Sequence, residues 1–306
     1  LPSRDTVARS FLTKHATIQD LEQLMDCKYP MLRIIAYQTI VDRQEYEYFN
    51  LLLNHLSDTA RVKFWFDEDI LNNSQISSLM IMKANEDNGL SPIQKKQLIR
   101  TVLLQHPYLD ISNSMIRDIE PDEEFYELIK NRAISYTQDC NKQLINSFAL
   151  SKFNKKEDVN FLNQVFSKKY EERYCLIWVF KGIEQFPDDR FYKILQDYYN
   201  ENYEDLVSED YVDEDIILYL TRAIAAYQNT EALKLLQNIE KMNSQFGDSK
   251  ASVKNNKFIY KAMLINYDTI YKEYLNKMEL QFDDFYSKYT RYSGKDLREY
   301  NDKPKW

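Results

Sequence analysis

A run of acidic residues and tyrosines between Lys193 and Arg222 offers the most distinctive chemistry in the sequence. No basic residue interrupts this run, and its acids are Asp197, Glu201, Glu204, Asp205, Glu209, Asp210, Asp213, Glu214 and Asp215. Carboxylates steer a basic partner toward such a surface, and tyrosine rings supply contact area. We expect a basic protein or peptide to contact Tyr199, Tyr203, Glu204, Asp205, Glu209, Asp210 and Tyr211. The alternative is a solvated loop whose last acids favour the N-terminus of the next helix.

Four lysines further along the chain fall on one face of a helix. Their numbering steps by four, three and four residues, and they are Lys250, Lys254, Lys257 and Lys261. We include them among the candidate partner-binding residues, as a contact for phosphate, for an acidic partner or for the acidic run itself. The alternative is an exposed face that keeps the protein in solution.

Signatures of catalysis and cofactor binding are absent from the sequence. Glycine occurs only at positions 89, 182, 247 and 294, which excludes phosphate-binding loops, dinucleotide fingerprints and nucleophile elbows. The three histidines, His15, His55 and His106, lie far apart and form no HExxH motif. We therefore predict no catalytic residue, no cofactor and no metal site.

The three cysteines, Cys27, Cys140 and Cys175, are also widely separated. Their odd number and the absence of CxxC spacing argue against a disulfide framework. We expect buried thiols that pack as small hydrophobic residues.

Charge and hydropathy exclude further classes of function. The net charge is −8, with 40 Lys and Arg against 48 Asp and Glu, so no nucleic-acid partner is expected. The longest apolar run, Cys175–Phe180, is far shorter than the ~20 residues that span a bilayer, and we expect its Trp178 to lie in the core. The chain begins at Leu1, so the compartment stays open: cytoplasmic, or periplasmic or secreted if a signal peptide was removed.

The elements that position these residues are predicted to be helices. Only 4 Gly and 7 Pro occur in 306 residues, too few for the tight turns of a sheet protein. Apolar residues recur at helical spacing, and helix starts are marked at Thr17 with Asp20 and at Ser91-Pro92 with Gln94. We predict an all-α fold with essentially no strand. The stretch with Val62, Phe64, Trp65, Ile70 and Leu71 is counted among the helices.

Short helices arrive in pairs with a repeated layout. Four stretches each join two apolar helices by a polar loop: Leu32–Leu56, Leu144–Phe166, Tyr174–Tyr199 and Ile216–Ile239. Such units are typical of helical-repeat solenoids. We predict a repeat array over residues 1–245, a capping helix or helix pair over 246–292 and a tail over 293–306.

The N-terminal part resembles a HEAT repeat, a member of the armadillo-like helical-repeat family. The residues that carry the resemblance are Leu21–Asp26 (LEQLMD) and Pro30–Ala36 (PMLRIIA), with a weaker copy at Leu52–Asp58 followed by Arg61-Val62. It covers about residues 17–70. The resemblance implies an α-solenoid of antiparallel helix pairs, the HEAT-like α-α superhelix, in which a small Ala36 lets a neighbouring helix cross.

The function expected from these features is a non-catalytic protein-binding scaffold. Stacked helix pairs present an extended concave surface, which such folds use for recognition. Two alternatives stay open: an enzyme with an acidic concave site, and a structural subunit of an envelope-associated assembly. The sequence does not identify the partner or the oligomeric state.

Overall fold

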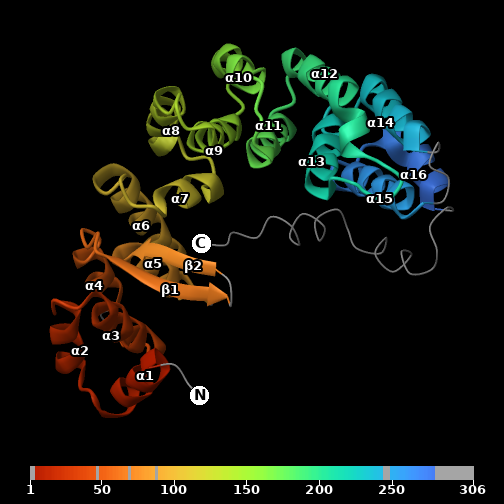
Figure 1. Cartoon of the computed structure of the whole chain (residues 1–306). Helices are drawn as coiled ribbons and strands as arrows, with labels where there is room; N and C mark the ends of the chain where they lie inside the picture. The colour runs from red at the N-terminus through yellow and green to blue at the C-terminus, as the bar shows by residue number, and fades with distance from the viewer. Residues whose placement is uncertain (1–3, 46–47, 68–69, 87–88, 244–248, 280–306) are drawn as a thin grey trace. The chain divides into compact units, whose positions relative to one another are not determined.

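The computed structural model describes residues 4–45, 48–67, 70–86, 89–243 and 249–279. This part of the chain is all-α apart from one hairpin (Figure 1). It divides into two compact units, one ending at Met115 and one beginning at Ile116. The described part of the capping helix or helix pair expected over 246–292 belongs to the second unit, whereas residues 280–292 and the expected tail at 293–306 lie outside the described residues.

Unit 1 is built around helix α3. Its helices are α1 (Arg4–His15), α2 (Ile18–Met25), α3 (Pro30–Asp42), α4 (Tyr48–Asn54), α5 (Ile76–Asn85), α6 (Pro92–Gln105) and α7 (Ser112–Asp118), which crosses into unit 2. Helix α3 packs against α1, α2 and α5, and Ala36 on it is fully buried, as expected. Both predicted helix starts are confirmed: Thr17 and Ser91 each form a capping box.

One predicted helix in unit 1 is wrong. Residues 62–71 form an antiparallel hairpin of β1 (Arg61–Asp67) and β2 (Ile70–Gln75), with Arg61 opposite Gln75. Val62 is buried while Arg61 and Lys63 are exposed, which is the alternation of a strand with one face on the core. The β-branched and aromatic residues of this stretch favour a strand. This two-stranded hairpin is the only sheet among the described residues, so the prediction of an all-α fold is confirmed.

Unit 2 is a succession of helix pairs. Its helices are α8 (Glu123–Ser135), α9 (Cys140–Ser151), α10 (Val159–Phe166), α11 (Arg173–Gln185), α12 (Asp189–Leu206), α13 (Glu214–Ala225), α14 (Thr230–Asn243), α15 (Lys250–Ile265) and α16 (Lys272–Glu279). Helices α9, α11, α13 and α15 pack side by side in chain order (Figure 1). All four predicted helix–loop–helix stretches are confirmed as α3–α4, α9–α10, α11–α12 and α13–α14.

Several side-chain contacts in unit 2 join residues that are the same distance apart in the sequence. The Tyr126 hydroxyl donates to Asp158 at 2.9 Å, and Lys156 Nζ lies 3.0 Å from Asp188. Lys169 Nζ lies 3.3 Å from Glu201. Each pair is 32 residues apart. These contacts link successive helical segments of unit 2.

The apolar run Cys175–Phe180 is only partly in the core. Cys175, Val179 and Phe180 are buried, whereas Trp178 is half-buried and packs on Phe148 with ring centroids 5.4 Å apart. The run lies on α11, whose turns carry successive residues around the helix, so a continuous apolar run cannot point to one side. The expectation of a fully buried Trp178 is wrong.

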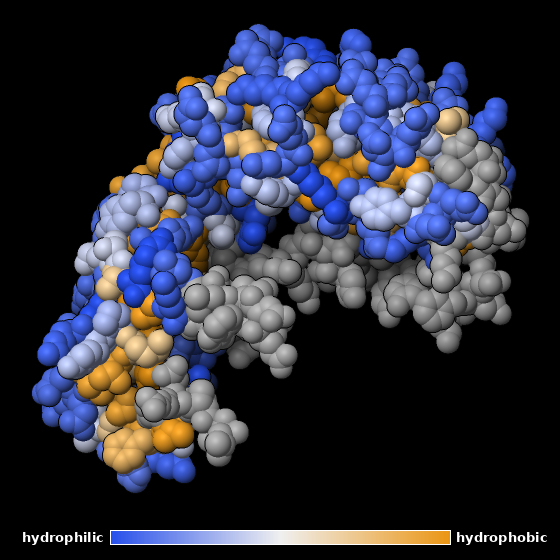
Figure 2. Space-filling model, in the orientation of Figure 1, coloured by the Kyte–Doolittle hydropathy of each residue, from blue (hydrophilic) through white to orange (hydrophobic). Residues whose placement is uncertain are grey.

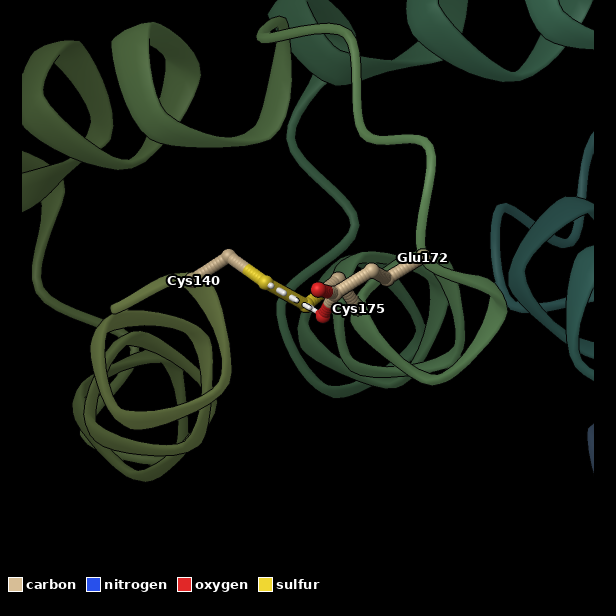
Figure 3. Close-up of side chains that lie close together, drawn as sticks. All are labelled: Cys140, Glu172 and Cys175. Atoms are coloured by element: carbon tan, nitrogen blue, oxygen red, sulfur yellow. Dashed lines mark hydrogen bonds between the residues drawn. A yellow bond between two sulfur atoms is a disulfide. The ribbon is translucent and has the colours of Figure 1, made fainter. Parts of the chain in front are cut away.

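Two of the three cysteines are not thiols. Cys140 at the start of α9 and Cys175 in the first turn of α11 form a disulfide, with their Cα atoms 6.2 Å apart (Figure 3). Cys27 is free and half-buried. The prediction of buried thiols fails for Cys140 and Cys175 because their helices are adjacent in the packing although they are distant in sequence.

Asp188 ties three segments of unit 2 together. It caps the N-terminus of α12, and its carboxylate accepts hydrogen bonds from Arg190 Nε at 2.8 Å and Lys156 Nζ at 3.0 Å. The Tyr227 hydroxyl donates to its backbone carbonyl at 2.7 Å. The carboxylate is buried, and the Arg190 hydrogen bond, opposed by desolvation, keeps its pKa well below the usual value.

Asp188→Asn should destabilise unit 2 by ~1–3 kcal/mol at pH 7, since charge-assisted hydrogen bonds are lost while asparagine still caps the helix. The pKa of Asp188 is lower in the folded than in the unfolded state, so its carboxylate stabilises the fold at pH values above the unfolded pKa of ~3.9. This stabilisation is lost as the pH falls toward the folded-state pKa. The difference from wild type should therefore shrink below about pH 4. Urea unfolding at several pH values measures it. Asp189→Asn, at an exposed neighbour, is the control, and a pH-independent deficit would contradict the account.

Candidate partner-binding site

The acidic run forms the end of one helix and a turn closed by a backbone bridge, whereas the alternative interpretation was a solvated loop. Helix α12 continues to Leu206, so Glu204 and Asp205 occupy its last turn. An antiparallel bridge between Val207 and Val212 then closes the chain. The Ser208 N–H donates to the Tyr211 carbonyl at 2.8 Å. We call residues 204–211 the acidic turn.

Buried anchors hold the acidic turn in place. Leu206, Val207 and Val212 are buried, and the Asp213 N–H donates to the Leu206 carbonyl at 2.9 Å. The Asp213 side chain then caps helix α13 by accepting from the Ile216 N–H. The turn therefore presents its side chains from a fixed backbone.

The acids of the run divide into two groups. Those flanking the turn are neutralised: Lys193 pairs with Asp197, Lys169 with Glu201, Arg173 with Asp213 and Asp215, and Lys254 with Glu214. Within the turn, Glu204, Asp205, Glu209 and Asp210 are all exposed, and no basic side chain of the described residues pairs with them. The negative charge of the run is thus concentrated at the turn. Figure 2 shows a mostly hydrophilic surface on the side of unit 2 that faces the viewer.

Two of these acids lie where they disfavour the fold. Glu204 and Asp205 are in the last turn of α12, which contains no basic residue. The C-terminal end of a helix carries partial negative charge, so an acid there costs about 0.3–1 kcal/mol. The placement of these acids is therefore not explained by helix stability.

Only one of the three candidate tyrosines is available to a partner. Tyr211 is 50% exposed, whereas Tyr199 and Tyr203 are each 6% exposed. The rings of Tyr199 and Tyr203 pack edge-on, 5.0 Å apart, and burial raises the pKa of Tyr203 to about 12. Their spacing on α12 places both rings on the side that faces the core. We therefore no longer count Tyr199 and Tyr203 among the candidate partner-binding residues.

The lysine face of α15 is partly engaged within the chain. Lys254 pairs with Glu214, which joins the basic face to the acidic run at one point. Lys257 and Lys261 are half-buried and also make interactions, while the side chain of Lys250 lies outside the described residues. None of these contacts reaches the four acids of the acidic turn. The exposed candidates that remain are Glu204, Asp205, Glu209, Asp210 and Tyr211.

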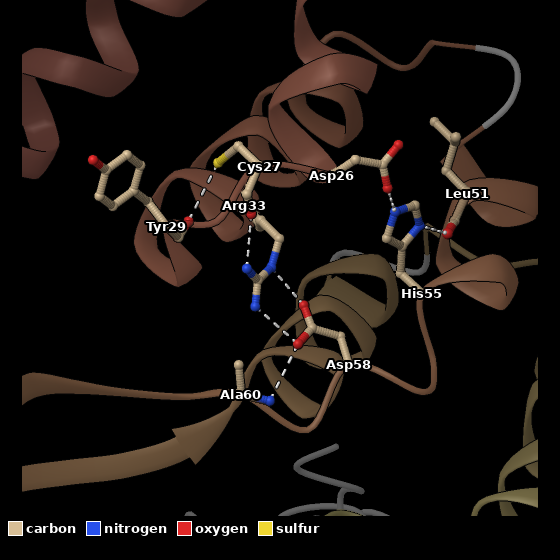
Figure 4. A network of polar contacts seen from close by, with 8 residues as sticks. All are labelled: Asp26, Cys27, Tyr29, Arg33, Leu51, His55, Asp58 and Ala60. Carbon is tan, nitrogen blue, oxygen red and sulfur yellow. Dashed lines mark hydrogen bonds and ion pairs between the residues drawn. The ribbon is translucent and has the colours of Figure 1, made fainter.

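Ionisable groups also gather in unit 1, where they line a polar hollow of ≈ 650 Å³, and Figure 4 shows their polar contacts. Arg33 donates to both oxygens of Asp58, at 2.7 and 3.0 Å, and to the Cys27 carbonyl at 2.8 Å. His55 Nδ1 lies 2.7 Å from the Leu51 carbonyl and Nε2 3.2 Å from Asp26. These groups are occupied with one another, an arrangement that favours structure over catalysis.

Three residues in unit 2 were missed as a group. Cys140, Glu172 and Cys175 lie together with their ligand atoms within 4.8 Å of one another. The separation of 35 residues between the cysteines is close to the 33 residues between Phe153 and Phe186, which occupy equivalent places in consecutive helix pairs. This similarity of spacing was the signal in the sequence that could have indicated that Cys140 and Cys175 lie close together.

Comparison with known proteins identifies no relative. No protein-family model matches the chain, and no curated protein or solved structure matches it. Within the described residues, every helix is too short or too polar to cross a bilayer.

Proposed function

We propose that this protein is a non-catalytic scaffold of HEAT-like helical-repeat type, an α-solenoid of antiparallel helix pairs. It binds a basic protein or peptide at the acidic turn. The observation that carries the proposal is a set of four exposed carboxylates on an anchored turn, Glu204, Asp205, Glu209 and Asp210, which have no basic partner within the described part of the chain.

Support for the repeat architecture comes from each unit by itself. In unit 2, α9, α11, α13 and α15 follow one another side by side, and contacts recur at 32 residues. In unit 1, Arg33 of the first HEAT-like motif pairs with Asp58 of the second copy, and both side chains are largely buried. A pair that links consecutive motifs is what a repeated layout favours.

Charge and anchoring support recognition at the acidic turn. Natural proteins often keep residues that lower the stability of the fold when those residues are needed for function. Exposed acids that lower stability are therefore consistent with a role in binding. A fixed backbone lowers the entropy that binding must overcome. Tyr211, half-exposed beside Asp210, adds apolar contact area next to the charges.

Neutralising the turn should weaken binding without harming the fold. The variant Glu204→Gln, Asp205→Asn, Glu209→Gln and Asp210→Asn should bind an immobilised lysine-rich peptide about tenfold more weakly than wild type at low salt. The difference should decline as the Debye length falls toward ~8 Å at physiological ionic strength. The midpoint temperature of thermal unfolding should be unchanged or slightly higher, because repulsion between these acids and the helix C-terminus is relieved.

A control variant with the same net charge distinguishes the effect of the acidic turn on binding from the effect of net charge. Glu120→Gln, Glu127→Gln, Glu171→Gln and Glu273→Gln remove the same number of exposed carboxylates elsewhere in unit 2. The acidic turn is not the docking site if both variants bind the peptide with the affinity of wild type. The same conclusion follows if both variants lose affinity equally.

A further inference from the structure

The disulfide between α9 and α11 has a carboxylate directly against it. Glu172 Oε2 lies 3.4 Å from Cys140 Sγ and 3.8 Å from Cys175 Sγ (Figure 3). Tetrahedral zinc with sulfur and oxygen ligands spaces those ligand atoms by about 3.5–3.8 Å. The carboxylate oxygen therefore already stands at ligand spacing from both sulfurs.

The Glu172 carboxylate lies against the disulfide without capping a helix. Glu172 is the N-cap residue of α11, but its side chain makes no capping hydrogen bond; its one hydrogen-bonding neighbour besides the sulfurs among the described residues is the Tyr174 hydroxyl, whose pKa it raises. It also faces two sulfurs, and a disulfide sulfur carries no proton to donate. After reduction, the same carboxylate faces two groups that donate as thiols or bind a cation as thiolates.

Both cysteines occupy the first turn of a helix. Cys140 is the first residue of α9, and Cys175 is the third residue of α11. The N-terminal end of a helix carries partial positive charge, which stabilises a thiolate. Zinc binds thiolates, so this placement favours the ligand form of each cysteine. Asp139 next to them caps α9 and pairs with Lys142, which leaves the fourth ligand to water.

We propose that, in the reduced protein, Cys140, Cys175 and Glu172 bind a thiophilic divalent cation such as Zn²⁺. A dithiol reductant gives two electrons and two protons to the disulfide and itself becomes a disulfide. The cation then displaces both thiol protons into solvent and bridges α9 to α11. Oxidation by a disulfide oxidant reverses these steps: both sulfur ligands are consumed in the new bond and the cation is released. The same two helices are thus tied together in either state.

A cobalt titration tests the site. The full chain is reduced, freed of reductant without air, shown to contain three thiols and titrated with Co²⁺. We expect a sulfur-to-cobalt charge-transfer band that saturates at one equivalent, is displaced by Zn²⁺ and is absent from the oxidised protein. Glu172→Gln should weaken binding by at least about tenfold, and Cys175→Ser should abolish the band.

Two further measurements keep the proposal falsifiable. Zn²⁺ should slow alkylation of Cys140 and Cys175 in the reduced chain without protecting Cys27, even if a cysteine variant folds poorly. Cys27→Ser should titrate like wild type. The proposal is overturned if the reduced chain shows no charge-transfer band, or if the band persists in Cys175→Ser. It is also overturned if Zn²⁺ leaves the alkylation of Cys140 and Cys175 unchanged.

Discussion

Glu184→Leu is expected to destabilise unit 2 by ~3–5 kcal/mol, the largest loss we predict for a single substitution. Glu184 on α11 accepts a hydrogen bond from Arg222 Nε on α13 at 2.9 Å, and the two side chains are 12% and 5% exposed. The Asn266 amide at the end of α15 donates to the same carboxylate oxygen at 3.2 Å. Removing the carboxylate leaves the Arg222 cation buried without its anion. Urea unfolding followed by circular dichroism measures the loss.

A double variant and a surface pair serve as controls. Glu184→Leu combined with Arg222→Met should recover much of the stability, because replacing both members of a buried pair by apolar groups is often neutral. Lys193→Ala breaks the exposed pair with Asp197 and should cost no more than about 1 kcal/mol. A loss below about 1 kcal/mol for Glu184→Leu would show that the buried pair does not join α11 to α13 energetically.

Reduction of the Cys140–Cys175 disulfide is expected to cost ~3–4 kcal/mol in the absence of metal. The crosslink spans 35 residues, and in the chain-entropy account it removes that loop's freedom from the unfolded state. Urea unfolding of the oxidised chain, and of the reduced chain with a chelator present, gives the difference. Zn²⁺ added to the reduced chain should restore part of it, because a cation that binds the folded state stabilises it.

The free cysteine provides the control for this measurement. Cys27→Ser should leave the difference between oxidised and reduced protein unchanged, since Cys27 takes no part in the bond. Thiol counting without reductant should find one reactive thiol per chain. Three thiols under those conditions, or equal stability before and after reduction, would contradict the crosslink.

Local sequence signals predicted the helices well. Thr17 and Ser91 mark helix starts by side-chain capping, which depends on residues only three positions apart. The same short range explains the four confirmed helix pairs. The hairpin at Arg61–Gln75 was missed because its apolar residues also suit a helix, although Arg61, Val62 and Lys63 alternate as residues of a strand do.

Contacts between residues that are distant in the sequence could not be predicted from the sequence alone. Cys140 pairs with Cys175, and Glu184 with Arg222, only because α9, α11 and α13 pack in succession. At the candidate site, sequence alone could not separate the paired acid Glu214 from the unpaired acid Asp210, because the separating fact is where Lys254 lies. The burial of Tyr203 depended likewise on which face of α12 meets the core.

The association rate constant for a basic ligand, measured across a salt series, tests recognition at the acidic turn most directly. Exposed charges act mainly by steering encounter, so wild type should associate with a lysine-rich peptide more slowly as salt rises. The variant neutralised at Glu204, Asp205, Glu209 and Asp210 should associate slowly at every salt concentration. Tyr211→Ala should instead associate like wild type and dissociate faster, because it removes contact area. An association rate that falls equally steeply with salt in wild type and in the neutralised variant would contradict the account.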